Sequence, residues 1–518
     1  MSEIHKRIRK QSLHGRIMPA QDTIPFFGNG MVLGFSGFST ANPKVVPMAL
    51  AEYMEKNHLQ GEMRFTVYTG ASMGRDIEDR WAGLQMINRR APWLASNVGR
   101  KEINAGRTRM SDVHLSKFAQ ALRNGFHPLN KKGKIDLAIV EACAITEEGG
   151  IVLTSDVGMS LEMILMAEKI IIEINTAMPS FEGLHDIPAT KKVPFNEPIL
   201  ITKVDDRIGT TQIPCDPEKI IAIVESKDLG FGRPQPPPGE NEKAIASHIL
   251  DFFEFEVKNH RLPENLLPMQ SGVGSIANAV FGGLATGPFD HLQIWTEVMQ
   301  DTTLDLMDAG KLDFVSGTSF TLSDNGKERF YNNFKKYTDR LVLRPTYLSN
   351  HAELIRRFKV IAMNTPIEFD IYAKANSSLV GGSSIVAGIG GSGDFLRNAY
   401  LSIMHSPSTR STKTDPTGIS CVLPLVTHVD HTEHDLDVFV TEQGVADVRG
   451  LCPKERARVI IDKCAHPDYQ PILQDYFDRA TREGLARGAG HEPHMLFKVF
   501  NMQKNLAQKG TMKIDNWD

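Results

Sequence analysis

The strongest constraint on the fold is an alternation of short apolar runs with longer amphipathic ones. In the first half of the chain, helical segments such as 44–56 and 160–168 separate runs that read as strands. Strands and helices that alternate at this spacing indicate βαβ units and a largely parallel sheet. The predicted strands of this half are 30–35, 64–69, 135–140, 169–174 and 220–225.

A proline-rich stretch, RPQPPPG at 233–239, interrupts this pattern. Four prolines in seven residues cannot continue a helix or a central strand, so we expect a linker at 233–240. A helix is predicted at 241–259, with Ile245, Ile249 and Phe252 or Phe253 on one face. Further strands are predicted near 292, 312–315, 341–343, 360–363, 421–426 and 438–441.

The predicted fold class is therefore α/β, with two open, largely parallel domains at 1–232 and 241–518. A length of 518 residues exceeds what one hydrophobic core supports, which agrees with more than one domain. No period of 20–50 residues repeats, which excludes solenoids and propellers.

Composition narrows the functional classes. The 58 Lys and Arg against 62 Asp and Glu give a net charge of −4, which argues against a nucleic-acid binder. Charged residues interrupt the longest apolar runs, so no membrane span is predicted. The five cysteines are scattered without a CxxC pair. Their spacing indicates a reducing compartment rather than secretion, and it argues against a structural zinc site.

The first 21 residues carry five basic side chains and one acid, Glu3. Mitochondrial transit peptides have this basic, acid-poor composition. A basic first helix of the folded domain explains the same residues, and composition alone leaves both alternatives open.

Residues 291–301, HLQIWTEVMQD, place a glutamate where a short strand gives way to a predicted helix at 298–309. Ligands and reacting groups gather at this carboxyl end of a strand in open α/β sheets. The dipole at the helix start is expected to keep Glu297 ionised, and an ionised glutamate serves as nucleophile or base. The alternative is that Glu297 only caps the helix or sits in its first turn.

A glycine-rich turn, GIGGSG at 388–393, matches the GxGxxG pattern of dinucleotide-binding proteins. The preceding residues are too small and too few for a buried strand, and Asp394 would repel a pyrophosphate. We therefore favour a turn that feeds a helix at about 394–403 and whose N–H groups cradle an oxyanion or a phosphate.

A second glycine turn, QSGVGSIANAV, occupies 270–280. Gly272 and Gly274 flank Val273, and a helix is expected from Ile276 onward. About 20 residues separate this turn from Glu297, so one α/β unit can present both at the same sheet edge. Taken alone, such a turn has a structural role more often than a binding role.

Three histidines, His428, His431 and His434, resemble metal ligands in the segment HVDHTEH. The residues before them read as a strand that runs into a loop, and strand geometry sends His428 and His431 to opposite faces. Hydrogen bonding or surface exposure is therefore favoured over metal binding.

Several polar residues follow other predicted strands. Glu442 closes a strand in VTEQG, either as a second functional carboxylate or as a tether for a turn. Ser72 in TGAS and the serines Ser36 and Ser39 in SGFS are candidate donors to a substrate carboxylate.

Together these segments resemble one family over nearly the full length. QSGVGSIANAV, WTEVMQD, GIGGSGDF, HVDH, VTEQGVADVRGL and KCAHPDY occur in the order found in the acetyl-CoA hydrolase/transferase branch of the class I CoA-transferases. The resemblance implies two domains of the CoA-transferase type with the active site between them.

The resemblance also implies a covalent mechanism of the succinyl-CoA:acetate transferase type. Glu297 attacks the acyl-CoA carbonyl to give an acyl-glutamyl anhydride, and CoA then forms a glutamyl-CoA thioester. A small carboxylate, acetate or succinate, takes the CoA from succinyl-CoA or propionyl-CoA. Coenzyme A is thus a substrate, and no separate cofactor or metal is implied. The alternative is an acetyl-CoA hydrolase in which water intercepts the anhydride.

Site residues follow from the resemblance position by position. The oxyanion donors are Val273 and Gly391, and Ser72, Asn350 and Glu442 are assigned to the substrate. Relatives often carry Asn where this chain has Ser275 and Ala387. The CoA contacts implied are Gly272, Val273, Gly274, Ser275, Ile276, Ala387, Gly391 and Lys413.

The resemblance finally implies a homodimer that acts on acyl-CoA and small carboxylates, with no nucleic-acid or membrane partner. The shared core of the family begins at about 7–20 in this chain, which favours the basic first helix. Location stays open between mitochondrion and cytoplasm.

Overall fold

The computed structural model describes residues 2–190, 194–230 and 232–518, which form two compact units. One unit boundary, between Pro234 and Gln235, falls within the predicted linker. The predicted continuous domain at 241–518 differs from this division, because 293–358 and 387–394 belong to the first unit. Periodicity locates a helix or strand but does not say which core it joins. The first unit comprises Met1–Pro234, Gln293–Phe358 and Ala387–Asp394, and the second comprises Gln235–Leu292, Lys359–Val386 and Phe395–Asp518.

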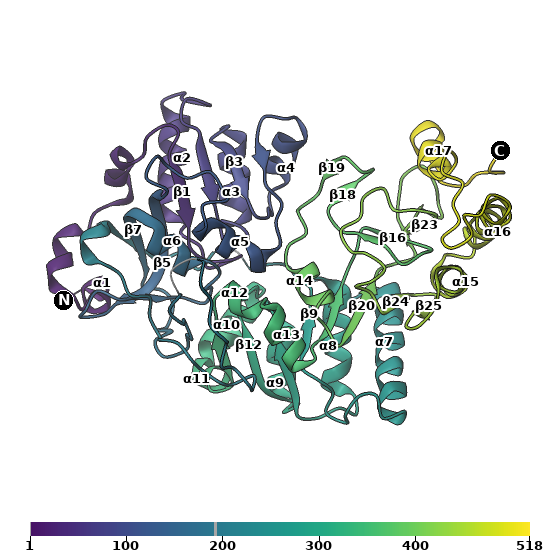
Figure 1. The fold of residues 1–518 in the computed structure, drawn as a ribbon. Helices are drawn as coiled ribbons and strands as arrows, with labels where there is room; N and C mark the ends of the chain where they lie inside the picture. Colours follow the sequence, from purple (N-terminus) through teal and green to yellow (C-terminus); the bar gives the residue numbers. More distant parts are fainter. Residues whose placement is uncertain (1, 191–193, 231) are drawn as a thin grey trace. The chain divides into compact units, whose positions relative to one another are not determined.

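The first unit contains a sheet with strand order β4-β3-β2-β1-β5-β7-β8, and β6 pairs with β5 (Figure 1). Neighbouring strands are parallel except for β5 and β6. All five strands predicted for this half are present, as β1, β2, β5, β7 and β8. The bounds are β1 Val32–Phe35, β2 Phe65–Tyr68, β3 Ile87–Ala91, β4 Arg109–Met110, β5 Ile135–Ile145, β6 Ile151–Leu153, β7 Ala167–Asn175 and β8 Ile220–Ser226.

The helices of this part of the chain are α1 Glu3–Arg7, η1 Gln11–Arg16, η2 Ala20–Phe26, α2 Val45–Lys56, α3 Arg75–Gly83, α4 Asn97–Asn104, α5 Leu115–Arg123, α6 Ser160–Met166 and η3 Pro217–Lys219. The later segments contribute β10 Leu292–Trp295, β11 Val298–Met299, α9 Asp301–Asp308, β12 Leu312–Gly317, β13 Ser319–Phe320, α10 Asp324–Asn332, α11 Phe334–Thr338, β14 Leu341–Leu343, α12 Thr346–Ser349, α13 Ala352–Phe358 and α14 Ser392–Leu396.

Helices cover both faces of the first sheet. Side chains alternate along a strand, so Leu33 packs in the core that contains α2 and α3. Gly34 faces the other way, where an added Cβ would lie 2.7 Å from Met163 Sδ of α6. Tyr68 of β2 also contacts α5, with its ring centroid 5.6 Å from that of Phe118. The result is the layered α/β architecture predicted from the sequence.

Strand β3, with the sequence INRRA, was not predicted, because two arginines break the apolar pattern. Arg90 is nevertheless buried, and its guanidinium donates to Glu78 Oε1 at 2.7 Å. A buried, paired arginine is therefore compatible with a central strand.

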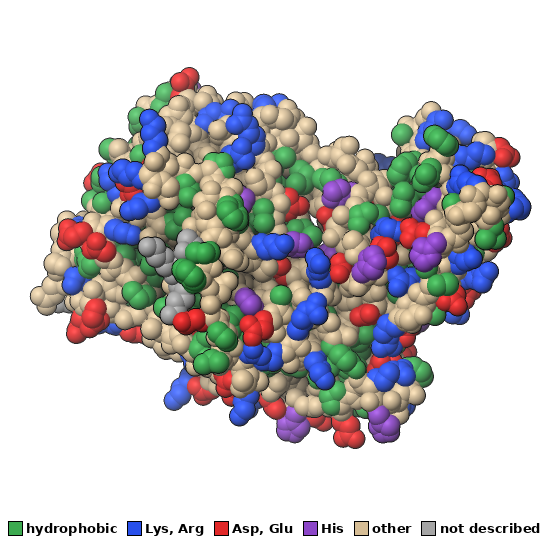
Figure 2. Space-filling view, viewed as in Figure 1, with side chains coloured by type: hydrophobic (Ala, Val, Ile, Leu, Met, Phe, Trp, Pro, Cys, Tyr) green, Lys and Arg blue, Asp and Glu red, His purple; other side chains and the backbone are tan. Residues whose placement is uncertain are grey.

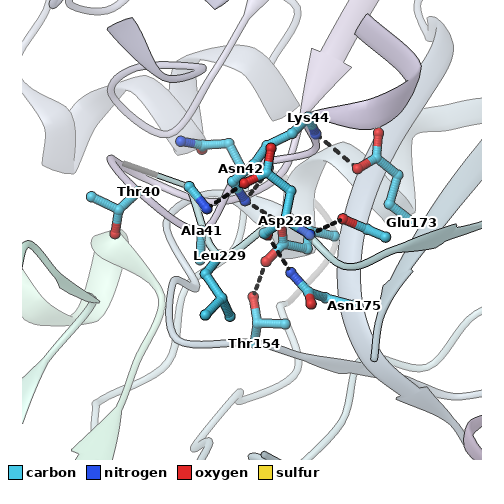
Figure 3. A network of polar contacts seen from close by, with 12 residues as sticks. Thr40, Ala41, Asn42, Lys44, Thr154, Glu173, Asn175, Asp228 and Leu229 are labelled. Atoms are coloured by element: carbon cyan, nitrogen blue, oxygen red, sulfur yellow. Dashed lines mark hydrogen bonds and ion pairs between the residues drawn. The ribbon is translucent and has the colours of Figure 1, made fainter. Parts of the chain in front are cut away.

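A buried polar network fixes the start of α2 at the carboxyl ends of β5 and β7 (Figure 3). Glu173 accepts hydrogen bonds from the backbone N–H groups of Lys44, Val45 and Val46, at 2.7–3.1 Å. The ammonium of Lys44 donates to Glu141 at 2.6 Å. Glu173 thus supplies the acceptors that a helix N-terminus otherwise lacks.

The basic N-terminal segment packs on the first unit. Helix α1 spans Glu3–Arg7, and both Ile4 and Ile8 are buried. The backbone N–H of Arg9 donates to Ile145 O at 2.9 Å, at the end of β5. The predicted basic first helix is therefore confirmed for these residues.

The second unit contains strands in the order β9-β15-β20-β24-β25, parallel up to the antiparallel pair of β24 and β25. Helix α7 runs from Glu240 to Lys258 with Ile245, Ile249 and Phe253 buried, as predicted. The other bounds are β9 Met269–Ser271, α8 Ser275–Thr286, β15 Ile361–Asn364, β16 Glu368–Asp370, β17 Ala375–Asn376, β18 Leu379–Val380, β19 Ser384–Ile385, β20 Leu401–His405, β21 Thr409–Arg410, β22 Ile419–Ser420, β23 Val422–Leu423, β24 Val438–Thr441, β25 Gly444–Asp447, α15 Pro453–Cys464, α16 Gln470–Ala486 and α17 Asn501–Lys509.

Acidic and basic side chains are interspersed over the face of the molecule drawn in Figure 2. Among the described residues, no helix is both long enough and apolar enough to cross a membrane.

Candidate active site

Glu297 lies just past the end of β10, on backbone held by neighbouring strands. Its carbonyl oxygen accepts from Thr318 N at 2.8 Å and from Ser319 N at 3.1 Å, where β12 leads into β13. The indole of Trp295 donates to Ser349 O at 2.8 Å and so ties the end of β10 to α12. The carboxylate therefore projects from a rigid part of the first unit, as a reacting group requires.

Asn350 holds the Glu297 side chain. It follows the last residue of α12 and is fully buried, and its Nδ2 donates to Glu297 Oε1. The amide oxygen of Asn350 accepts from Ser349 Oγ at 2.8 Å, which fixes the orientation of the amide. The predicted substrate residue Asn350 is thus a direct partner of the predicted nucleophile.

A second carboxylate, Asp394, completes this cluster. Asn350 Nδ2 also donates to Asp394 Oδ2 at 3.0 Å. Ser116 at the start of α5 donates to Asp394 from its backbone N–H at 2.9 Å and from its hydroxyl at 2.5 Å. His114 Nδ1 lies 3.8 Å from Asp394 Oδ1. No sequence pattern pointed to Ser116 or His114, which are about 280 residues from Asp394 along the chain.

The environment raises the pKa of Glu297 to about 8, mainly through burial. The nearby Asp394 carboxylate raises this pKa further, whereas the hydrogen bond from Asn350 lowers it. The prediction that a helix dipole keeps Glu297 ionised is therefore wrong. Val298 and Met299 form β11 and pair with β13, and the helix begins only at Asp301 behind its Gln300 cap.

Gly391 of the GIGGSG turn lies directly against this carboxylate. An added Cβ at Gly391 would stand 1.6 Å from Glu297 Oε1 and 2.5 Å from Asn350 Nδ2. No larger residue fits without displacing the carboxylate. The turn predicted to face the nucleophile therefore does so, and the role of its N–H as an oxyanion donor stays a prediction.

The 387–394 segment is anchored to residues just before α5 and at its start. Ile389 N donates to the Asp112 carboxylate at 2.9 Å, and Leu115 N donates to Gly390 O at 3.3 Å.

The helix predicted at about 394–403 is wrong beyond its first turn. Helix α14 spans only Ser392–Leu396, and buried strand β20 begins at Leu401. The run at 399–402, with the sequence AYLS, is too short for periodicity to distinguish the start of a strand from the continuation of a helix.

A cavity of about 890 Å³ adjoins the cluster within the first unit. Ser116, which binds Asp394, is part of its wall, as are Leu348 and His351 on either side of Asn350. The volume is that of a site for a small organic ligand. The cavity thus meets the cluster at Ser116, on the side of Asp394.

The second glycine turn lies in the second unit, between β9 and α8. Gly272 N donates to Met363 O at 2.9 Å, and an added Cβ would be 3.3 Å from Asn364 Oδ1. Val273 and Ser275 are partly exposed, while Ile276 is buried in α8. The predicted turn and the helix after it are confirmed, and the turn follows strand β9. The predicted contacts of Gly272, Val273, Gly274, Ser275 and Ile276 with CoA, and the oxyanion role of Val273, stay predictions.

Glu442 tethers a turn in the second unit, as one of the two alternatives from the sequence predicted, and its role toward a substrate stays a prediction. Its Oε2 accepts from Ser408 N at 2.8 Å, and its Oε1 accepts from the Ser408 hydroxyl. Lys413 is exposed on the loop between β21 and β22, and its contact with CoA stays a prediction, as does that of Ala387.

The serines past β1 and β2 shape their own turns. Ser72 is buried, and its hydroxyl accepts from Gly74 N at 3.1 Å. Ser36 Oγ accepts from Glu141 N at 2.8 Å, and Ser39 N donates to Asp156 at 2.9 Å. These hydrogen-bond partners are protein groups, and a role of the serines toward a substrate carboxylate stays a prediction.

Two histidines of the HVDHTEH segment have different surroundings. His431 is buried, with Nε2 2.9 Å from Ser377 Oγ, whereas His428 is partly exposed and its Nε2 lies 3.2 Å from Asp430 Oδ1. These contacts agree with the hydrogen-bonding interpretation.

Comparison with solved structures defines the class of fold. The chain superposes on RipA from Yersinia pestis with a TM-score of 0.68 at 20% identity, over 93% of this chain and 98% of the other. A 4-hydroxybutyrate CoA-transferase from Porphyromonas gingivalis gives a TM-score of 0.60 at 20% identity, over 90% of this chain and 99% of that one. The α/β fold is thus of the CoA-transferase type.

Sequence comparison then defines the family. The profile of the acetyl-CoA hydrolase/transferase N-terminal domain matches residues 1–225, and that of the C-terminal domain matches 326–477. The chain is 54% identical to the acetyl-CoA hydrolase of Schizosaccharomyces pombe over 100% of both chains. It is 52% identical to that of Saccharomyces cerevisiae, over 99% of this chain and 98% of the other. The chain belongs to the acetyl-CoA hydrolase/transferase family, as the sequence motifs predicted.

Proposed function

We propose that this enzyme hydrolyses acetyl-CoA through a covalent intermediate on Glu297. The observation that carries the proposal is the Glu297 carboxylate, held by Asn350 and covered closely by the backbone of Gly391. The names of relatives more than 50% identical over the full length support acetyl-CoA as substrate and water as acceptor. This reverses the order of the two alternatives drawn from the sequence, where transfer to a carboxylate came first.

The chemistry proceeds in two displacements. A Glu297 oxygen attacks the acetyl carbonyl, the carbon–sulfur bond breaks, and an acetyl-glutamyl anhydride and CoA thiolate form. Water then attacks the anhydride, which releases acetate and restores the Glu297 carboxylate, and the water protons pass to the products. Each step passes through a tetrahedral oxyanion that backbone N–H groups stabilise, with Gly391 as one donor.

The rate is expected to rise with pH through about 8. Only the ionised carboxylate is nucleophilic, and a pKa of about 8 leaves roughly a tenth of Glu297 ionised at pH 7. We expect log kcat/KM to increase with unit slope below this value and to level off above it. A pH series from 6 to 9.5 with acetyl-CoA measures it, and a rate independent of pH over that range contradicts the prediction.

Release of CoA is expected without any acceptor acid. The assay contains purified enzyme and acetyl-CoA in a buffer free of carboxylates. A thiol reagent measures the release of CoA, and acetate is measured in parallel. Hydrolysis yields one thiol per acetate, and in ¹⁸O-water the covalent route places label in Glu297 over several turnovers when water attacks the glutamyl carbonyl of the anhydride. Label in acetate alone is the result both of water attacking the acetyl carbonyl of the anhydride and of Glu297 acting as a general base, and an acetyl adduct on the peptide that contains Glu297 separates the two.

Transfer of CoA to a small carboxylate is the second candidate, because the matching family includes transferases as well as hydrolases. It uses the same anhydride, which CoA converts into a glutamyl-CoA thioester before acetate or succinate takes the CoA. The test uses succinyl-CoA or propionyl-CoA as donor. Two results favour this candidate: thiol release that depends on added acetate or succinate, and formation of the new thioester. Two further properties are proposed on the resemblance alone. One is a homodimer, which light scattering tests, and the other is a mitochondrial or cytoplasmic location.

A further inference from the structure

The function proposed above uses Glu297 and Gly391 but leaves Asp394 without a task. Asp394 is buried, and its carboxylate accepts from both donors of Ser116 and from Asn350. Burying a carboxylate this close to another one is costly, so the arrangement calls for an explanation.

The Asn350 amide connects the two carboxylates. Its Nδ2 carries two hydrogens, and one is donated to Glu297 Oε1 and the other to Asp394 Oδ2. If the amide were turned over, its oxygen would face two carboxylates and be repelled by both. Asp394 therefore fixes which end of Asn350 points at Glu297.

Ser116 in turn fixes Asp394. The backbone N–H and the hydroxyl of Ser116 both donate to this carboxylate and favour its charged form. Two further titratable groups lie close by. His114 is 3.8 Å from Asp394, and Asp112 accepts from Ile389 N in the glycine turn. Burial raises the pKa of Asp394, whereas the Ser116 and Asn350 hydrogen bonds and His114 lower it.

We propose that Asp394 is a positioning residue for Glu297: anchored by Ser116, it aims the Asn350 amide at the nucleophile and keeps a negative charge beside it. The inference rests on the proposed function, because it takes Glu297 as the reacting group.

A fixed charge at this place favours the first chemical step. Ionised Glu297 is repelled by Asp394, and this repulsion is part of the reason why Glu297 holds its proton so firmly. When Glu297 attacks, its charge moves to the CoA sulfur, and the anhydride is neutral at Glu297. The repulsion is therefore relieved between the ground state and the transition state, which is the kind of difference that accelerates a reaction.

The test replaces Asp394 by asparagine, which keeps the shape and removes the charge. We expect the midpoint of the pH profile of kcat/KM to move down by about one pH unit or more. Above the midpoint, kcat is expected to fall about 10-fold to 100-fold because the Asn350 amide is less well oriented, while KM for acetyl-CoA changes less than twofold. Asp339→Asn, at an exposed position after α11, has the same effect on net charge and serves as the control.

A second measurement does not depend on turnover. Carbodiimide labelling of the peptide that contains Glu297, quantified by mass spectrometry against pH, reports the protonation of Glu297 directly. A downward shift of the labelling midpoint in Asp394→Asn supports the inference, and an unchanged midpoint overturns it even if activity falls. Asp394→Ser, also neutral and smaller, is expected to shift in the same way and replaces Asp394→Asn if that variant does not fold. Failure of the proposed function has a different signature, namely activity that survives Glu297→Gln.

Discussion

Glu297→Gln is expected to lower kcat for acetyl-CoA cleavage by about 10⁴-fold or more, the size of effect seen when an enzyme loses its nucleophile. Glutamine has nearly the shape of glutamate and its Oε1 still accepts from Asn350, so the substitution removes the reactive oxygen and little else. The assay is thiol release from acetyl-CoA, together with mass spectrometry of the peptide that contains residue 297 after incubation with substrate. An acyl or CoA adduct is expected on the wild-type peptide and none on the variant.

Stability gives an independent check on the same variant. Glu297 ionises less readily in the folded protein than its ordinary pKa of 4.5 implies, because burial raises the pKa to about 8. Ionisation therefore costs the folded state stability progressively between these two values, and glutamine avoids this cost. We expect the Tm of Glu297→Gln to exceed that of the wild type by a larger margin at pH 8.5 than at pH 5.

Glu225→Gln is the matched control. Glu225 also lies near the end of a strand of the first unit, is partly exposed, and accepts from Thr176 Oγ at 2.9 Å. Its substitution is expected to change kcat less than twofold. Glu297→Gln with more than a hundredth of the wild-type kcat contradicts the assignment of the nucleophile.

The sequence located this glutamate but misjudged its surroundings. Strand-end reasoning selected Glu297, because the apolar run up to Trp295 is short and clear. The residues after it, Val298 and Met299, fit a helix by propensity and pattern. In the structure they pair with β13, a contact that lies 21 residues away in sequence and that no local pattern encodes.

The rest of the cluster required tertiary structure. Asn350 was predicted only from the family resemblance. Ser116 could not be predicted, because its role depends on a contact between Asp394 and the start of α5 that forms only in the folded chain. The five strands of the first half were predicted because each contains a clear apolar run, whereas two arginines, one of them buried, obscured the pattern of β3. The sequence analysis assigned residues 293–358 to the C-terminal domain, whereas in the structure they belong to the first unit. Periodicity shows which face of a helix or strand is buried, but not which core that face packs against.

Gly391→Ala is expected to reduce kcat/KM by at least 10²–10³-fold, about the effect of losing one oxyanion donor. The new methyl group would overlap Glu297 Oε1, which it would approach to 1.6 Å, and it would also press on Asn350. The carboxylate must then move, and the backbone N–H of residue 391 shifts relative to the reacting carbon. A displacement of this kind costs both alignment and charge stabilisation.

Steady-state kinetics and thermal melting of this variant separate a local effect from a general loss of folding. Gly83→Ala, at the end of α3, is the control, because a Cβ there meets no atom within 4 Å. We expect Gly83→Ala to retain wild-type kinetics, and Gly391→Ala to stay folded while it loses activity and the Glu297 adduct. If Gly391→Ala keeps more than a third of the wild-type kcat/KM, the turn tolerates a side chain, and close packing of Gly391 on the nucleophile is not needed for the reaction.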